Sequence, residues 1–324
     1  MRWACLCTHL LLCLLALTAS ACRQGERAPI RTRAEAMPPG AAKVSPASDL
    51  FPPVLHSSRW QAPRPLEGPI NTAGAEDSAF ITPDGSILYF FFTPDASVPP
   101  EKQLLDGATG LWWSKKVGGQ WAEPERIILG RGPSLEGAAF VEGDTLWFGS
   151  VRTGNYREID IYAARLKDGR WVDVKNAGRQ LNQEYDIGEM HIAPDGRALY
   201  CGGPGQWGDP SKDLYLLQRE GDGWSKPVAL PEPINTREYS EDQPFVTPDG
   251  NELWFTGQSR RGYPGPAVFR SVKLADGSWG PPEEIVSNFA AEPTLDAHGN
   301  LYFVHHFIRD GKILEADIYV AYRN

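Results

Sequence analysis

Short apolar runs separated by turn residues recur along most of the chain. Two clear copies, at 80–90 and 245–255, each read as an apolar strand, a Thr-Pro-Asp-Gly turn and a second apolar strand. A third copy spans 191–200, and two degenerate copies lie at 140–148 and 294–303. One leucine marks the second strand of every copy, 48 to 58 residues after the one before it: Leu88, Leu146, Leu199, Leu253 and Leu301. A period of this length predicts a repeat architecture.

A second block follows each copy and predicts two more strands per repeat. In its clearest form, Asp160-Ile-Tyr begins an apolar run that ends at an Asp-Gly turn before Trp171. Glycine or Asp-Gly supplies the positive φ of a hairpin turn, so each repeat reads as four antiparallel strands, A to D. Four-stranded units repeated radially are typical of a β-propeller. The sequence therefore predicts an all-β fold, a five-bladed β-propeller.

The last repeat lacks its D strand, and the start of the domain is expected to supply it. The chain ends in a C strand at 317–324, whereas the missing Trp-x-x-Pro segment begins at Trp60. We expect residues 60–66 to complete the fifth blade, which leaves no open sheet edge in a domain spanning 58–324. A six-bladed alternative would use 23–57 as a degenerate blade, but that stretch has no strand pattern.

The N-terminus predicts export. A basic start at Arg2 and an apolar core at 10–17 are typical of a signal peptide, here residues 1–21. Ala19-Ser20-Ala21-Cys22 resembles a bacterial lipobox, which implies lipidation of Cys22 and a periplasmic or outer-membrane-attached lipoprotein. The alternative is ordinary secretion after cleavage at the same bond. Residues 22–57 are Pro/Ala-rich with no apolar period, so a flexible tether is expected there.

Composition narrows the classes of function. The chain has 41 acidic and 32 basic residues, a net charge of −9, and an acidic surface repels nucleic acid. No run after residue 22 is long enough to span a bilayer as a helix, so the only membrane contact expected is the lipid anchor. Cys201 is the one cysteine of the folded part, which excludes an internal disulfide and favours a structural thiol.

Several motifs resemble the TolB-type, WD-like propeller repeat of exported bacterial proteins. They are Asp160-Ile-Tyr, Trp224-Ser-Lys-Pro, Pro233-Ile-Asn-Thr and Thr247-Pro-Asp-Gly. The resemblance covers residues 59–324 and implies the propeller fold. Because its motifs are turn and packing residues, it implies no particular activity.

The longer connections gather on one face of the predicted propeller. The A–B and C–D turns are short, whereas the B–C connections are long, at 93–110, 149–159, 201–212, 257–266 and 304–316. Loops that vary on a rigid scaffold commonly bind ligands. We therefore expect ligand-binding residues in these connections: Arg152, Tyr156, Trp207, Arg260, Arg261, Tyr263, His305 and Arg309.

Acidic residues precede strand A in every repeat. Because strand A is innermost, these carboxylates should ring the mouth of the central channel. The candidates are Asp77, Glu189, Asp242 and Glu292, with Glu136 as a weaker fifth. Carboxylates near Arg, Tyr and Trp suit sugar hydroxyls and rings. The structural alternative is that each acid accepts hydrogen bonds from backbone amides of the neighbouring blade.

Two functions remain open. The first is a non-catalytic binding module that recognises a glycan or an envelope protein on the loop face, and the TolB-type resemblance favours it. The alternative is a glycoside hydrolase, because paired carboxylates are what glycosidic cleavage requires. The sequence has no phosphate-binding loop, nucleophile elbow or zinc spacing, so we expect no cofactor and no metal. We also expect a monomer, with His191 packed where other repeats have phenylalanine.

Overall fold

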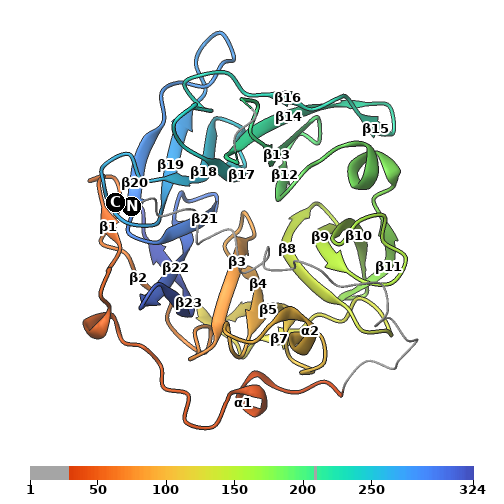
Figure 1. Cartoon of the computed structure of the whole chain (residues 1–324), viewed down its shortest axis with the longest axis vertical. Helices are drawn as coiled ribbons and strands as arrows, with labels where there is room; N and C mark the ends of the chain where they lie inside the picture. Colours follow the sequence, from red (N-terminus) through yellow and green to blue (C-terminus); the bar gives the residue numbers. More distant parts are fainter. Residues whose placement is uncertain (1–28, 208–209) are drawn as a thin grey trace.

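The structure, a computed structural model, describes residues 29–207 and 210–324. The predicted signal peptide and Cys22 lie outside the described residues. Antiparallel groups of strands are arranged around a common centre (Figure 1). This arrangement confirms the predicted all-β propeller fold. Within the described parts of the chain, no helix is long and apolar enough to cross a membrane.

Each group of strands, or blade, is built outward from the centre. The innermost strands are β3 (Ala75–Ile81), β8 (Leu135–Glu142), β12 (Met190–Ile192), β17 (Glu241–Val246) and β21 (Ala290–Leu295). The second strands are β4 (Ile87–Thr93), β9 (Thr145–Val151), β13 (Ala198–Pro204), β18 (Glu252–Gln258) and β22 (Leu301–Arg309). The third strands are β5 (Gly110–Val117), β10 (Asp160–Lys167), β14 (Lys212–Glu220), β19 (Pro266–Val272) and β23 (Lys312–Ala321).

The outer strands are shorter and less regular. They are β6 (Gln120–Trp121) and β7 (Glu125–Arg126), β11 (Arg170–Asn176), β15 (Gly223–Trp224) and β16 (Val228–Ala229), and β20 (Glu283–Ser287). We number the blades 1 to 5 in the chain order of β3, β8, β12, β17 and β21. Short helical segments are α1 (Arg33–Ala36), η1 (Pro46–Ser48), α2 (Pro100–Gln103) and η2 (Gln180–Glu184).

The Thr-Pro-Asp-Gly segments form the tight turns that the sequence predicts. Thr82 Oγ1 donates a hydrogen bond of 2.6 Å to Asp84 Oδ1, and the following Gly85 has a φ of 68°. Thr247 and Asp249 repeat this contact in blade 4, also at 2.6 Å. These turns join the first and second strands of a blade and leave the opposite ends of the inner strands to form the site.

The start of the domain pairs with the end of the chain. In β2 (Arg64–Pro65), Arg64 pairs with Val320 and Pro65 with Tyr319 on the outer side of β23. Trp60 is 3% exposed, and its indole Nε1 donates to Gly299 O at 2.9 Å. These contacts lie where the closing strand of the fifth blade was expected. The effect of this strand on stability stays a prediction, taken up in the Discussion.

The expected flexible tether differs from the structure over residues 29–57, which we call the strap. The strap packs along blades 1, 5 and 4, and its strand β1 (Val54–Leu55) pairs with β20 (Figure 1). Arg33 is 3% exposed and forms an ion pair of 3.2 Å with the buried Glu76. Lys43 Nζ contacts two further buried carboxylates, Glu315 and Asp317. Besides these charged contacts, the strap has scattered apolar ones, such as Phe51 against Phe289, that follow no period, so hydrophobic patterning did not indicate it.

The B–C connection expected at 304–316 is also different. β22 and β23 continue as one long hairpin that turns at Asp310-Gly311, with Arg309 paired to Lys312. His305 and His306 therefore lie within a strand, and both are buried. The Asp-Gly pair is itself a hairpin signal, which places the turn beyond the histidines.

Candidate active site

The inner strands bulge where they approach the loop face. The strand register shifts between Asp77 and Phe80 in β3, and corresponding shifts occur in β8, β17 and β21. At each bulge one residue has positive φ, and these residues are Ser78, Ala138, Gln243 and Glu292. Bulges re-aim side chains, and strained backbone of this kind gathers at functional sites. Here the bulges place these residues around the central cavity.

Aromatic rings close the channel beneath this level. Phe80, Phe140 and Phe245 surround His191, with ring centroids 4.7–6.1 Å from the imidazole. His191 Nδ1 accepts a hydrogen bond from Val246 N, and burial lowers its pKa to about 3. His191 is therefore neutral and packs in the core as expected, which makes it part of the floor of the cavity.

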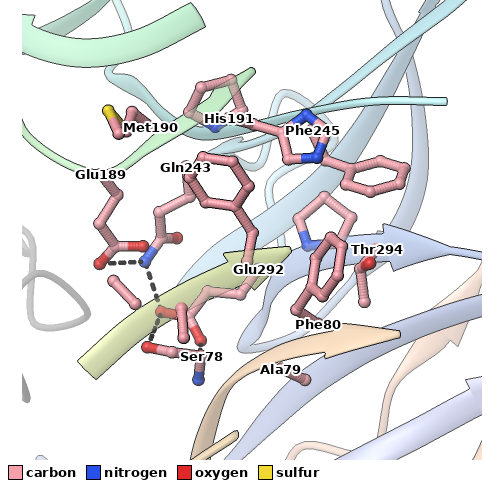
Figure 2. Close-up of a pocket in the computed structure, with 15 residues that line it drawn as sticks. Ser78, Ala79, Phe80, Glu189, Met190, His191, Gln243, Phe245, Glu292 and Thr294 are labelled. Atoms are coloured by element: carbon pink, nitrogen blue, oxygen red, sulfur yellow. Dashed lines mark hydrogen bonds between the residues drawn. The ribbon is translucent and has the colours of Figure 1, made fainter. Parts of the chain in front are cut away.

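Two glutamates and an amide lie together above that floor. The Gln243 Nε2 group donates to Glu292 Oε1 at 2.6 Å and to Glu189 Oε1 at 3.4 Å (Figure 2). Ser78 N donates to the second oxygen of Glu292, also at 2.6 Å. Three different blades supply Glu189, Gln243 and Glu292, so the folded ring brings the two carboxyl groups within reach of one amide.

Asp77 lies directly behind Glu292. The two side chains share a hydrogen bond, and His306 Nε2 lies 3.8 Å from Asp77 Oδ1. Burial opposes ionisation of Asp77, but hydrogen bonds and the charge of His306 outweigh it and lower its pKa. Burial and the neighbouring charges of Asp77 and Glu189 raise the pKa of Glu292 well above its usual value. The environment of the pair therefore favours the proton on Glu292 and the negative charge on Asp77, as in other coupled carboxyls.

Glu189 is the other carboxyl group of this cluster whose pKa is strongly raised. Burial, followed by the charge of Asp242, raises its pKa to about 8, although Lys212 opposes the shift. Lys212 Nζ forms an ion pair of 2.6 Å with Asp242 Oδ2. The protonated form of Glu189 is thus favoured beside the ion-paired Asp242.

Two adjoining cavities lie beside these groups. The channel cavity, of about 60 Å³, is lined by all five inner strands and by Glu189 and Glu292. A larger pocket, of about 560 Å³, lies between blades 2 and 3. Ala138, Phe140, Glu189 and Met190 line both. Glu189 therefore stands where the two spaces meet.

Only two of the four acids predicted as catalytic candidates line the channel cavity. Glu189 and Glu292 line the channel cavity, whereas Asp77 and Asp242 are buried behind it. The expected inter-blade hydrogen bond occurs at Glu292, which accepts from Ser78 N of the next blade. Glu136 does not line the channel cavity: it is fully buried and paired with Arg152 at 3.1 Å. We therefore leave Glu136 out of the candidate site.

The eight residues predicted to bind a ligand line neither the channel cavity nor the larger pocket. Arg152 and Arg260 pair with the buried Glu136 and Glu241. His305 Nε2 contacts Asp49 of the strap at 2.7 Å.

The other five predicted residues lie at the periphery. The ring of Tyr263 is tilted against that of His56, Trp207 lies beside Arg237, and Tyr156, Arg261 and Arg309 are exposed. Loop position alone thus did not identify the residues that face the centre.

Sequence reasoning missed Ser78, Gln243, Lys212 and His306. Aligning the repeats on Phe80, Phe245 and Thr294 places Ser78, Gln243 and Glu292 at one repeat position, so a signal for two of the four was present. Lys212 and His306 reach the acids only through the packing of neighbouring strands, which no local pattern reports.

Two further observations concern cofactors and thiol chemistry. Among the described residues, no group of three or more His, Cys, Asp and Glu side chains is arranged to hold a metal ion. Cys201 is buried, and burial raises the pKa of its thiol above the usual value. The thiol is therefore protonated and packed, which fits a structural role.

Comparison with known proteins identifies the fold. No family model matches the sequence, and no curated protein matches it. A thermostable family-43 glycoside hydrolase of known structure is 13% identical, with a TM-score of 0.51 over 78% of this chain and 91% of that chain. An endo-arabinase from Bacteroides thetaiotaomicron is 14% identical, with a TM-score of 0.49 over 80% and 98% of the two chains. At these identities the likeness concerns the fold.

Proposed function

We propose that this protein is a glycoside hydrolase whose reacting groups are Glu189 and the Asp77–Glu292 pair. The observation that carries the proposal is the divergence of pKa values in one cluster. Hydrolysis of a glycosidic bond needs one carboxyl group that holds a proton and another group that is ionised. Groups whose environments push their pKa values apart mark such acid and base roles.

Glu189 is suited to be the proton donor. Its pKa of about 8 keeps it protonated at neutral pH, and its carboxyl lies where the two cavities meet. The Asp77–Glu292 pair supplies the negative charge that accepts a proton from water or stabilises a cationic sugar. Asp242, paired with Lys212, adds the charge that helps to keep Glu189 protonated.

The rival function is the binding module that the TolB-type resemblance favours, carried by an exported and lipid-anchored protein. A binding module needs several carboxylates that contribute similarly to the affinity for the ligand, and it needs no proton donor. It gives no reason for the unequal protonation of Glu189 and Asp77. Export and lipidation of Cys22 fit either function, and a mass spectrum of the mature N-terminus tests them.

Hydrolysis assays with acid-to-amide variants test the proposal. The substrates are 4-nitrophenyl glycosides of common pentoses and hexoses and the matching oligosaccharides. We expect turnover of at least one, and losses of about 10²–10⁴-fold in Glu189→Gln and Glu292→Gln with binding retained. Glu220→Gln, an exposed acid on β14, is the matched control and should keep full activity. Binding without turnover in the wild type would instead establish the binding module.

A further inference from the structure

The larger pocket between blades 2 and 3 has an aliphatic wall, which is unexpected for a site that binds only sugars. Ile159, Ile161, Ile187 and Met190 are only partly buried, and all four face this pocket. Phe148 and Leu181 lie behind them in the core. At about 560 Å³, the pocket is within the usual range for small-molecule sites. Its aliphatic surface has no cover from the described residues.

Three charged groups at the edge of this pocket, Arg157, Asp186 and Lys212, are engaged with other protein groups, and Glu158 is a further acid there. Arg157 forms an ion pair of 2.6 Å with Asp186 and also donates to Gln183 O. Lys212 is paired with Asp242. Against the aliphatic wall a sugar would leave hydroxyls without hydrogen-bond partners, which is costly, whereas an aryl or alkyl group would bury apolar surface there.

The amide and carboxyl groups of the cluster around Gln243 lie on the other side of Glu189. Ser78, Gln243 and Glu292 line the channel cavity, where they can bond to hydroxyl groups. Glu189 therefore lies between these polar groups and the aliphatic wall of the larger pocket. A glycosidic oxygen held at Glu189 would have its sugar over the channel and its leaving group in the pocket.

We infer that the substrate is a glycoside with an apolar leaving group, an aryl or long alkyl chain, bound between blades 2 and 3. This inference rests on the proposed function. In the reaction, the bond between the anomeric carbon and the glycosidic oxygen breaks, and the Glu189 proton passes to that oxygen to release the alcohol. The oxygen of water bonds to the anomeric carbon, and the proton of that water passes to the Asp77–Glu292 pair.

The test compares octyl and methyl glycosides of one sugar, because their leaving alcohols have similar acidity and differ in apolar surface. We expect kcat/KM to be at least tenfold higher for the octyl glycoside. Ile159→Ser should remove most of this preference, because it should lower kcat/KM for the octyl glycoside far more than for the methyl glycoside. Ile128→Ser is the matched control, since Ile128 is exposed outside the pocket, and it should change neither rate. Thermal melting of both variants verifies that they are folded.

Equal kcat/KM values for the two glycosides would overturn the inference and leave the hydrolase proposal standing. A separate measurement covers the case in which no glycoside is cleaved. Binding of 1-naphthol is followed by fluorescence in the wild type, Ile159→Ser and Glu189→Gln. Binding weakened at least fivefold by Ile159→Ser, and not by Glu189→Gln, supports the apolar pocket even if the protein is not a hydrolase. Absence of binding overturns it.

Discussion

Replacing Arg33 by methionine should destabilise the whole domain, because Arg33 connects the strap to blade 1. Arg33 and Glu76 are 3% and 0% exposed, and the guanidinium also donates to the backbone oxygens of Pro69 and Ile70. Removing one partner of a buried ion pair costs about 3–5 kcal/mol. Burial raises the pKa of Glu76 to about 7, so this carboxyl can take up a proton when Arg33 is absent. We therefore expect the free energy of unfolding to fall by about 3 kcal/mol, the lower end of that range.

The assay is thermal unfolding followed by circular dichroism. At about 2–4 °C per kcal/mol for a domain of this size, Arg33→Met should lower Tm by roughly 6–12 °C. The loss should be larger at pH 8.5 than at pH 6, where Glu76 can be protonated. Arg64→Met is the control, because Arg64 forms an exposed pair with Glu67 worth less than about 1 kcal/mol. A Tm within 2 °C of the wild type would show that the strap is a flexible tether after all.

Three further predictions concern the closing strand, the raised pKa values of buried acids, and the close approach of Gly202 to Asp242. A protein shortened to begin at residue 68 loses Trp60, whose ring centroid lies 5.5 Å from that of Trp254. Trp60→Ala alone should lower the free energy of unfolding by roughly 3–5 kcal/mol. A shortened protein that melts like the full domain would refute ring closure by this strand. The free energy of unfolding should fall as pH rises from 6.5 to 8.5, because four buried acids hold protons in the native state that they lose in the unfolded state. Their folded-state pKa values are about 7 for Glu76 and Glu241 and about 8 for Glu189 and Asp317. A Tm that is equal or higher at pH 8.5 contradicts this. Gly202→Ala places a methyl group 1.8 Å from Asp242 Oδ1 and should reduce kcat/KM more than tenfold while costing about 1–3 kcal/mol; unchanged kinetics would exclude Asp242 from the site.

The fold was predictable because the repeat is strong. The Pro-Asp-Gly turns and the leucine of each second strand are local signals, and each recurs in a blade. The strap was not predictable in this way. Its contacts join side chains more than 40 residues apart, such as Arg33 with Glu76 and Lys43 with Asp317, and it contains no periodic apolar face.

The site was predictable only in part, for a related reason. Position before the inner strand indicated Glu189 and Glu292, because every repeat brings that position to the centre. The division of roles between them depends on burial and on contacts with Lys212 and His306, which the assembled ring creates. Two of the residues chosen for their loop position, Arg152 and Arg260, instead pair with buried acids of their own blades.

The pH dependence of kcat/KM on a cleaved aryl glycoside tests the central claim most directly. If Glu189 donates the proton, the rate should fall as pH rises through about 8, the pKa that burial and Asp242 give this group. On the acidic side the rate should stay constant until the Asp77–Glu292 pair takes up a second proton. Because the pKa of Asp77 is lowered, this should happen at a pH below the usual pKa of an aspartate. Glu189→Gln should abolish the alkaline fall together with most of the activity. A wild-type rate that stays constant or rises from pH 7 to pH 9 would contradict the assignment of Glu189 as the acid.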